Sequence, residues 1–103
     1  MSAHPVRVEL PLHLMRLANL SGHETTLEIA APVTLRAVLD ELERRFPALQ
    51  GTMRDHVTKK RRDFLRFFVC QEDWSHRSPD ELLPEEIVSG KEPLLVIGAI
   101  AGG

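Results

Sequence analysis

One segment constrains the fold of this chain more than any other, the stretch "PVTLRAVLDELERRFP" at residues 32–47. Its apolar residues recur at the spacing of an amphipathic helix with a single apolar stripe. They are Leu35, Val38, Leu39, Leu42 and Phe46. Such a stripe has to be buried against another element, and no second helix of similar strength is predicted. Strands must therefore supply the surface on which this helix packs.

The predicted helix has a start signal at one end and a stop signal at the other, and its exposed face carries pairs of opposite charge. Thr34 is placed to cap the first turn, and Pro47 to end the last one. Two i,i+4 pairs of opposite charge, Asp40–Arg44 and Glu41–Arg45, are expected to add a little helix stability.

Four apolar stretches predict the strands, and turns and loops separate them. Alternation at period two indicates a strand over 5–15, although Pro11 cannot donate a ladder hydrogen bond and implies a bulge. The other strands are expected at 24–30, 64–70 and 93–100, with a turn at 19–23. Residues 48–63 suggest a short helix around 53–57 and then a basic connector. Residues 78–92 suggest a loop with one helical turn near 80–83, which Ser78 could cap.

The resulting order predicts an α+β fold, a mixed sheet of four to five strands with one main helix on one face. Placing the two most apolar strands, the first and the last, side by side in the centre would bury both. That pairing is the β-grasp arrangement, one of several α+β solutions. The 103 residues suggest a single domain over 1–98, followed by a flexible Gly-Gly tail at 99–103.

Composition excludes several functional classes. The net charge of −2 and pI near 6.2 argue against nucleic acid as a partner. No signal peptide opens the chain and no apolar run is long enough to span a bilayer, so we expect a cytoplasmic protein that does not bind membranes. The single Cys70 excludes an internal disulfide and a four-cysteine iron–sulfur cluster. The five histidines lack metal-site spacing, and we expect no metal.

The sequence closes on "AIAGG", directly after the apolar run "PLLVIG". At an average glycine usage of about 7%, two terminal glycines arise by chance in about 0.5% of chains. A carboxylate on Gly103 would be ionised at neutral pH, because its pKa is about 3.5. Gly102 and Gly103 lack a Cβ and could thread a narrow channel. Five extended residues reach roughly 15 Å.

Several segments resemble the MoaD/ThiS family of ubiquitin-like sulfur carriers. The resemblance rests on "VRVELP", "LDELERRFPAL", "FLRFFVCQED" and the final "AIAGG", and it covers residues 6–103. The insert at 48–63 and the "LP" at 10–11 are similar to MoaD-like and CysO-like members. Two positions differ from the family pattern: Cys70 stands where asparagine is common, and Gly98 where proline is common.

The resemblance implies a carrier protein that is not itself an enzyme and binds no cofactor. A MoeB/ThiF-like enzyme would use ATP to adenylate Gly103, and a sulfur donor would then convert the adenylate into a thiocarboxylate. Gly102 and the preceding Ala99, Ile100 and Ala101 would contact these partners.

The resemblance leaves the destination of the sulfur open. MoaD-like members deliver it to the large subunit of molybdopterin synthase, and this destination has the stronger base rate. CysO-like members deliver it to a cysteine synthase. Two alternatives remain: a protein modifier that joins Gly103 to a lysine by an isopeptide bond, and a plain interaction domain whose tail has no function.

Other residues have both a functional and a structural interpretation. Trp74 follows a turn, and we expect it to be exposed and, with Phe68, to contact a partner. Most of the phenylalanines near it are expected in the core. Cys70 is interpreted as a buried or half-buried thiol without a catalytic base. The basic run "KKRR" at 59–62 is either a solvated connector or a docking patch.

Overall fold

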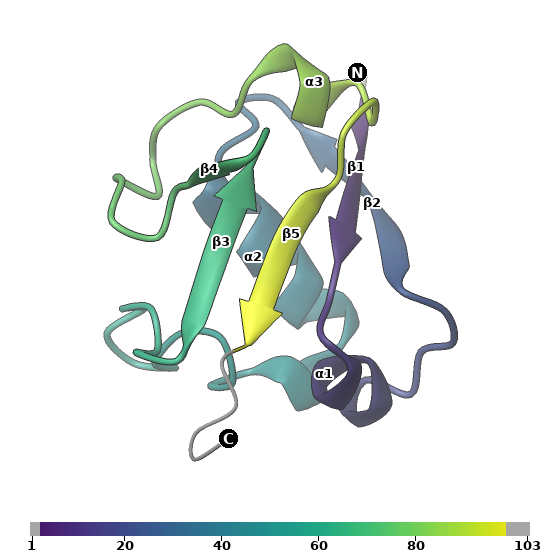
Figure 1. The fold of residues 1–103 in the computed structure, drawn as a ribbon, viewed down its shortest axis with the longest axis vertical. Coiled ribbons are helices and arrows are strands. Elements are labelled where there is room, and N and C mark those ends of the chain that lie inside the picture. The colour runs from purple at the N-terminus through teal and green to yellow at the C-terminus, as the bar shows by residue number, and fades with distance from the viewer. Residues whose placement is uncertain (1–2, 99–103) are drawn as a thin grey trace.

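The computed structural model describes residues 3–98 of the chain (Figure 1). Five strands form one mixed sheet: β1 (Ala3–Glu9), β2 (Glu24–Ala30), β3 (Leu65–Val69), β4 (Glu72–Asp73) and β5 (Leu94–Gly98). Their spatial order is β2-β1-β5-β3-β4. β1 and β5 run parallel in the centre, and the remaining neighbours are antiparallel. The predicted central pairing of the first and last strands is confirmed.

The main helix, α2 (Leu35–Arg45), lies behind the sheet in Figure 1 and covers one of its faces. The hydroxyl of Thr34 accepts a hydrogen bond from the Ala37 N–H, as the capping prediction requires. Pro47 opens a short 3₁₀ helix, η1 (Pro47–Leu49), where α2 ends. The apolar stripe of α2 is buried together with the inward-facing residues of the central strands. The core therefore lies between α2 and the inner face of the sheet.

The two ion pairs predicted on α2 are replaced by others. Glu41 pairs with Arg44, one turn away at i,i+3. Asp40 instead binds Arg54, which comes from the segment after η1. Asp40 is therefore paired with a residue from outside the helix, and not with Arg44 as the i,i+4 spacing predicted.

The predicted strand over 5–15 is wrong in its second half. β1 ends at Glu9, Pro11 follows, and a helix, α1 (Leu12–Leu17), begins. The alternating leucines have the period of a strand, but Leu12 is 63% exposed. Leu14 and Met15, which follow each other in the sequence, are both buried. Two successive buried residues fit a helix face and not a half-buried strand. Pro11 needs no N–H at the start of a helix, which resolves its position.

Two shorter predictions also need correction. Residues 53–57 form no helix, because the Asp55 carboxylate accepts hydrogen bonds from the N–H groups of Val57 and Thr58 and closes a turn. The helical turn expected near 80–83 lies later, as α3 (Glu85–Val88) after Pro84. Ser78 accepts from the Asp80 N–H, which makes a turn and not a helix cap.

Candidate functional site

The strongest candidate site lies where β1 and β5 separate, directly before residue 99. The two strands pair at Val8–Leu94 and Glu9–Leu95, and then Leu10 and Pro11 lead away into α1. Within residues 3–98, the end of β5 keeps β3 as its only paired neighbour. A groove of about 250 Å³ opens beside it, lined by Glu9, Leu10, Pro11, Leu95, Val96, Ile97 and Gly98.

Gly98 ends β5 against α1, and a side chain at this position would meet close neighbours. A Cβ at this position would lie 2.8 Å from Cε1 of His13 and 3.4 Å from a methyl group of Leu65. Separations below 3.0 Å require a neighbour to move. The ring of His13 thus lies beside residue 98, and a larger residue there would require this ring, the far end of a side chain, to shift.

The register of β3 against β5 places apolar side chains on the outer face of the sheet, away from α2. Phe68 lies opposite Leu95, and Arg66 opposite Ile97. Ile97 is 46% exposed, and Phe68 and Leu95 are half-buried. Single exposed apolar residues are ordinary, but neighbouring ones on a sheet mark an interaction surface.

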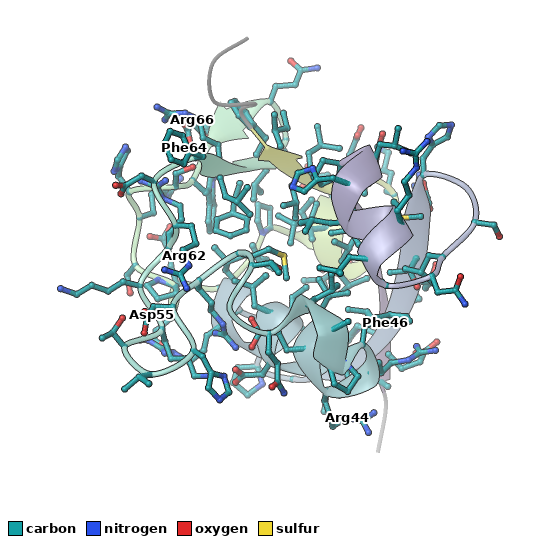
Figure 2. All side chains as sticks on the ribbon, turned by 90° about the horizontal axis from the view of Figure 1, so that it is seen from below. Arg44, Phe46, Asp55, Arg62, Phe64 and Arg66 are labelled. Carbon is teal, nitrogen blue, oxygen red and sulfur yellow. The ribbon has the colours of Figure 1, made fainter. Side chains whose placement is uncertain are left out.

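One further exposed side chain adjoins this face at the end of β5. Phe64 precedes Leu65, the residue that pairs with Gly98. Figure 2 views the molecule from this end and shows Phe64 beside Arg66. We call the set of Phe64, Phe68, Leu95 and Ile97 the apolar patch.

Two ion pairs flank the apolar patch, and one carboxylate beside it is unpaired within residues 3–98. Arg66 binds Asp73 at 3.0 Å, and Arg7 binds Glu24 at 2.8 Å. Hydrogen bonds from Ser75, helped by Arg66, hold the pKa of Asp73 below its ordinary value. The hydrogen bond from Arg7 lowers the pKa of Glu24 in the same direction. Glu9 is opposite Leu95 and lines the groove, and it forms no ion pair within residues 3–98. The patch therefore combines an apolar surface with a negative charge beside the groove.

The structure separates the residues that the sequence nominated for the site. Phe68 belongs to the apolar patch. Gly102, Gly103 and the contact residues 99–101 lie outside the described residues. Phe64, Leu95 and Ile97 were missed, because their exposure on the outer face depends on the register of β3 against β5.

Trp74 is not exposed, which corrects the prediction. Its side chain is 4% exposed, and the guanidinium of Arg77 covers the ring at 3.9 Å from its centroid. Cys70 and Gln71 adopt positive φ angles and turn the chain tightly after β3. The backbone N–H of Trp74 then donates to the backbone carbonyl of Phe67, which draws residue 74 back against the core. A buried indole offers little surface to a partner.

Cys70 is exposed at that turn, and not buried as predicted. Desolvation, together with the charges of Glu86, Glu92 and Glu72, raises the pKa of its thiol. The neutral thiol is a poor nucleophile. Across residues 3–98 no group of three or more histidine, cysteine or acidic residues could hold a metal ion. No helix in that range has the length and apolar character needed to cross a bilayer.

Comparison with known proteins gives a clear result for the fold alone. No family model matches the chain, and no curated protein matches it. Two solved structures of small archaeal modifier protein 1 superpose well. The Haloferax volcanii protein has a TM-score of 0.72 at 18% identity, with 94% of this chain and 97% of that chain covered. The Methanosarcina acetivorans protein has a TM-score of 0.72 at 18% identity, with both chains covered fully. The fold is therefore the ubiquitin-like β-grasp, with α2 on one face of a five-stranded sheet.

Proposed function

We propose that this chain is a ubiquitin-like carrier protein whose reactive group is the carboxylate of Gly103. One observation carries the proposal: the central strand of a β-grasp sheet leads, within five residues of Gly98, to Gly102 and Gly103. The protein acts as the substrate of other enzymes and not as an enzyme, and we place it in the cytoplasm. The proposal requires that Gly103 bear the free carboxylate of the chain.

The chemistry is activation followed by sulfur transfer. The carboxylate oxygen attacks the α-phosphorus of ATP on a MoeB/ThiF-like enzyme, pyrophosphate leaves, and an acyl-adenylate forms. A hydrosulfide equivalent from a sulfur-transfer partner then attacks the acyl carbon and AMP leaves, which yields a thiocarboxylate. The ATP belongs to the activating enzyme. Glycine at 102 and 103 leaves the carbonyl open to both attacks.

The apolar patch supplies the docking surface for the activating enzyme. It adjoins Gly98, so an enzyme bound there would hold its active site close to the start of residues 99–103. Its most exposed members are Ile97, on β5, and Phe64, which directly precedes β3. Aromatic and aliphatic side chains in such a position are the usual anchors of protein interfaces.

The thiocarboxylate donates sulfur to the large subunit of molybdopterin synthase, with a cysteine synthase as the CysO-like alternative. A second function, protein modification, is favoured by the solved structures, since both proteins named above are called modifiers. In that case Gly103 would form an isopeptide bond with a lysine of another protein.

The decisive experiment combines mass spectrometry with an adenylation assay. Intact chains purified from the source cell should end at Gly103 and carry sulfur in place of one carboxylate oxygen. A branched tryptic peptide bearing residues 99–103 would instead establish the modifier function. Chains that end elsewhere, or that an activating enzyme from the same cell never adenylates, overturn the proposal.

Variants separate the tail from the docking surface and from folding. Gly103→Ala should keep the parent melting temperature and slow adenylation. Adenylation at the parent rate would refute the steric role of glycine. Ile97→Asp should raise KM for the carrier at least about tenfold, a transition-state loss of roughly 1.4 kcal/mol. Leu82→Asp is the matched control: Leu82 is also exposed, and it lies near α3, at the opposite end of the sheet from α1 (Figure 1).

A further inference from the structure

A second cavity, of about 300 Å³, lies between α2, the loop at 54–61, β3 and the segment at 75–79. Six of its lining residues are cationic: Arg36, Arg54, Lys59, Lys60, Arg61 and Arg77. Its floor is apolar, formed by Leu35, Leu39, Phe67 and Pro79. No aspartate or glutamate lines it among the described residues. A cavity with this lining has an unusual excess of positive charge for a chain whose net charge is −2.

Three of the six cations form ion pairs with carboxylates that do not line the cavity. Arg36 binds Asp80 at 2.6 Å, and Arg77 binds Glu81. Arg54 is buried and forms two hydrogen bonds with Glu43 at 2.9 and 3.1 Å. Burial disfavours its charged form, but the bonds from Glu43 and Asp40 prevail and raise its pKa.

Of the other three cations, two lack a counter-charge within residues 3–98. Arg61 donates to the carbonyl oxygens of Leu65 at 2.6 Å and Ser75 at 3.1 Å, which hold its position without cancelling its charge. Lys60 forms no ion pair within residues 3–98. Lys59 is compensated, because Arg54 is paired with both Glu43 and Asp40 and the Nζ of Lys59 lies 4.0 Å from Glu43. About two positive charges therefore face the cavity uncompensated.

The loop that carries the two lysines is fixed by its own hydrogen bonds. Residues 54 and 61 form a β-bridge, and the Asp55 N–H donates to the Lys60 carbonyl at 2.7 Å. Figure 2 shows Asp55 and Arg62 in this loop, and their side chains pair at 3.8 Å. Lys59 has a φ of +63°, an angle that side-chain-bearing residues rarely adopt. These hydrogen bonds fix the place of both lysines in the loop.

We propose that this cavity binds a small organic phosphate ester, of the size of a nucleoside monophosphate. Lys59, Lys60 and Arg61 would hold the doubly charged phosphate, because ammonium and guanidinium donors form the strongest hydrogen bonds with phosphate oxygens. The apolar floor would take the planar or aliphatic body of the same molecule. The volume is at the lower end of small-ligand pockets and is walled by four segments, which suits a compact molecule better than an extended peptide.

The site is independent of the proposed carrier function. It lies on the inner side of β3, with Phe67 in its floor, whereas Phe68 and the apolar patch lie on the outer face. Within the basic run at 59–62, Arg61 is anchored to backbone carbonyls, whereas Lys59, Lys60 and Arg62 are exposed.

The test is a titration of the full chain with AMP and with inorganic phosphate, at about 0.15 M salt to suppress diffuse attraction. Heteronuclear NMR should show saturable shifts of amides at 58–61, 75 and 77. Lys59→Gln/Lys60→Gln should weaken AMP binding at least about tenfold, and Lys91→Gln/Arg16→Gln, which removes the same net charge from exposed positions elsewhere, should change it less than about twofold.

Four outcomes would overturn the proposal. The first is that AMP gives no saturable shifts at millimolar concentration. The second is that both double variants weaken binding equally, which would mean that only net charge matters. The third is that inorganic phosphate binds as tightly as AMP, which would leave the apolar floor without a role. The fourth is that an acidic peptide shifts the same amides when AMP does not, which would replace the small-molecule site with a protein interface.

Discussion

The buried pair Glu43–Arg54 offers the sharpest test of how this fold is held together. Glu43 projects from α2 and is 5% exposed, and Arg54 comes from the segment after η1 and is 3% exposed. Two hydrogen bonds join them, and Asp40 adds a third to the same guanidinium. Glu43→Ala would leave the guanidinium buried with one remaining partner, while Glu43→Ala/Arg54→Met would remove both charges.

The expected magnitudes follow from burial. Breaking a buried ion pair costs about 3–5 kcal/mol, because the remaining charge is left uncompensated. Asp40 keeps part of the compensation, but its side chain is 59% exposed and partly screened, so we expect about 3 kcal/mol for Glu43→Ala. Replacing both partners by apolar groups of similar volume is often neutral, so the double variant should lose only about 1 kcal/mol. The coupling energy should therefore exceed about 2 kcal/mol.

Urea unfolding followed by fluorescence and circular dichroism measures these differences. Trp74 is the only tryptophan and is buried, so it reports the loss of tertiary structure. Glu41→Ala is the control, because it makes the same substitution on the same helix but breaks the surface pair with Arg44, worth at most about 1 kcal/mol. If Glu43→Ala costs no more than Glu41→Ala, or if the single effects simply add, the pair does not hold the loop to α2.

Three further predictions concern single positions. Gly90→Ala should lower the free energy of unfolding by about 2 kcal/mol in thermal unfolding, because φ is +81° and a Cβ would lie 2.7 Å from a backbone oxygen of β1. Gly22→Ala is the control, because φ is +87° but a Cβ would meet only open space, and it should cost about half as much. The hydrogen bond from Arg7 lowers the pKa of Glu24, so the contribution of this pair to stability is present above the ordinary pKa near 4.5 and is lost as pH falls through the lower folded value. Glu24→Gln should therefore be less stable than the parent at neutral pH. An equal stability difference at about pH 2 would contradict the assignment. Alkylation of Cys70 by iodoacetamide, followed by mass spectrometry, should be slower at neutral pH than that of free cysteine, because the pKa of the thiol is raised.

The sequence alone predicts the parts of the fold in which local signal and burial agree. In α2 the apolar stripe, the Thr34 cap and the stop at Pro47 all point to the same element, and the structure has it within two residues. The central pairing of β1 and β5 followed from their apolar character. The error at α1 arose where signals conflict, because a helix of one and a half turns whose leucines alternate by chance carries the same period as a strand.

The candidate sites were harder to predict because each one is assembled by the topology. Phe64 lies near the end of β5 only because the antiparallel register of β3 against β5 pairs Leu65 with Gly98. The basic cavity joins residues from 35 to 79, and its charge excess depends on which arginines find carboxylates. Those pairings, such as Arg36 with Asp80, span tens of residues in the sequence and leave no local pattern.

A single alternation along β3 makes the two proposed surfaces separable. Phe67 points inward to the floor of the basic cavity, and Phe68, the next residue, pairs with Leu95 on the outer face. Because neighbouring strand residues face opposite sides of a sheet, one ligand cannot touch both side chains without unfolding the strand. Any coupling between AMP binding and adenylation of Gly103 would therefore have to be transmitted through the fold and not by a shared ligand. The absence of an effect of Lys59→Gln/Lys60→Gln on adenylation would show that the two sites work independently on one scaffold.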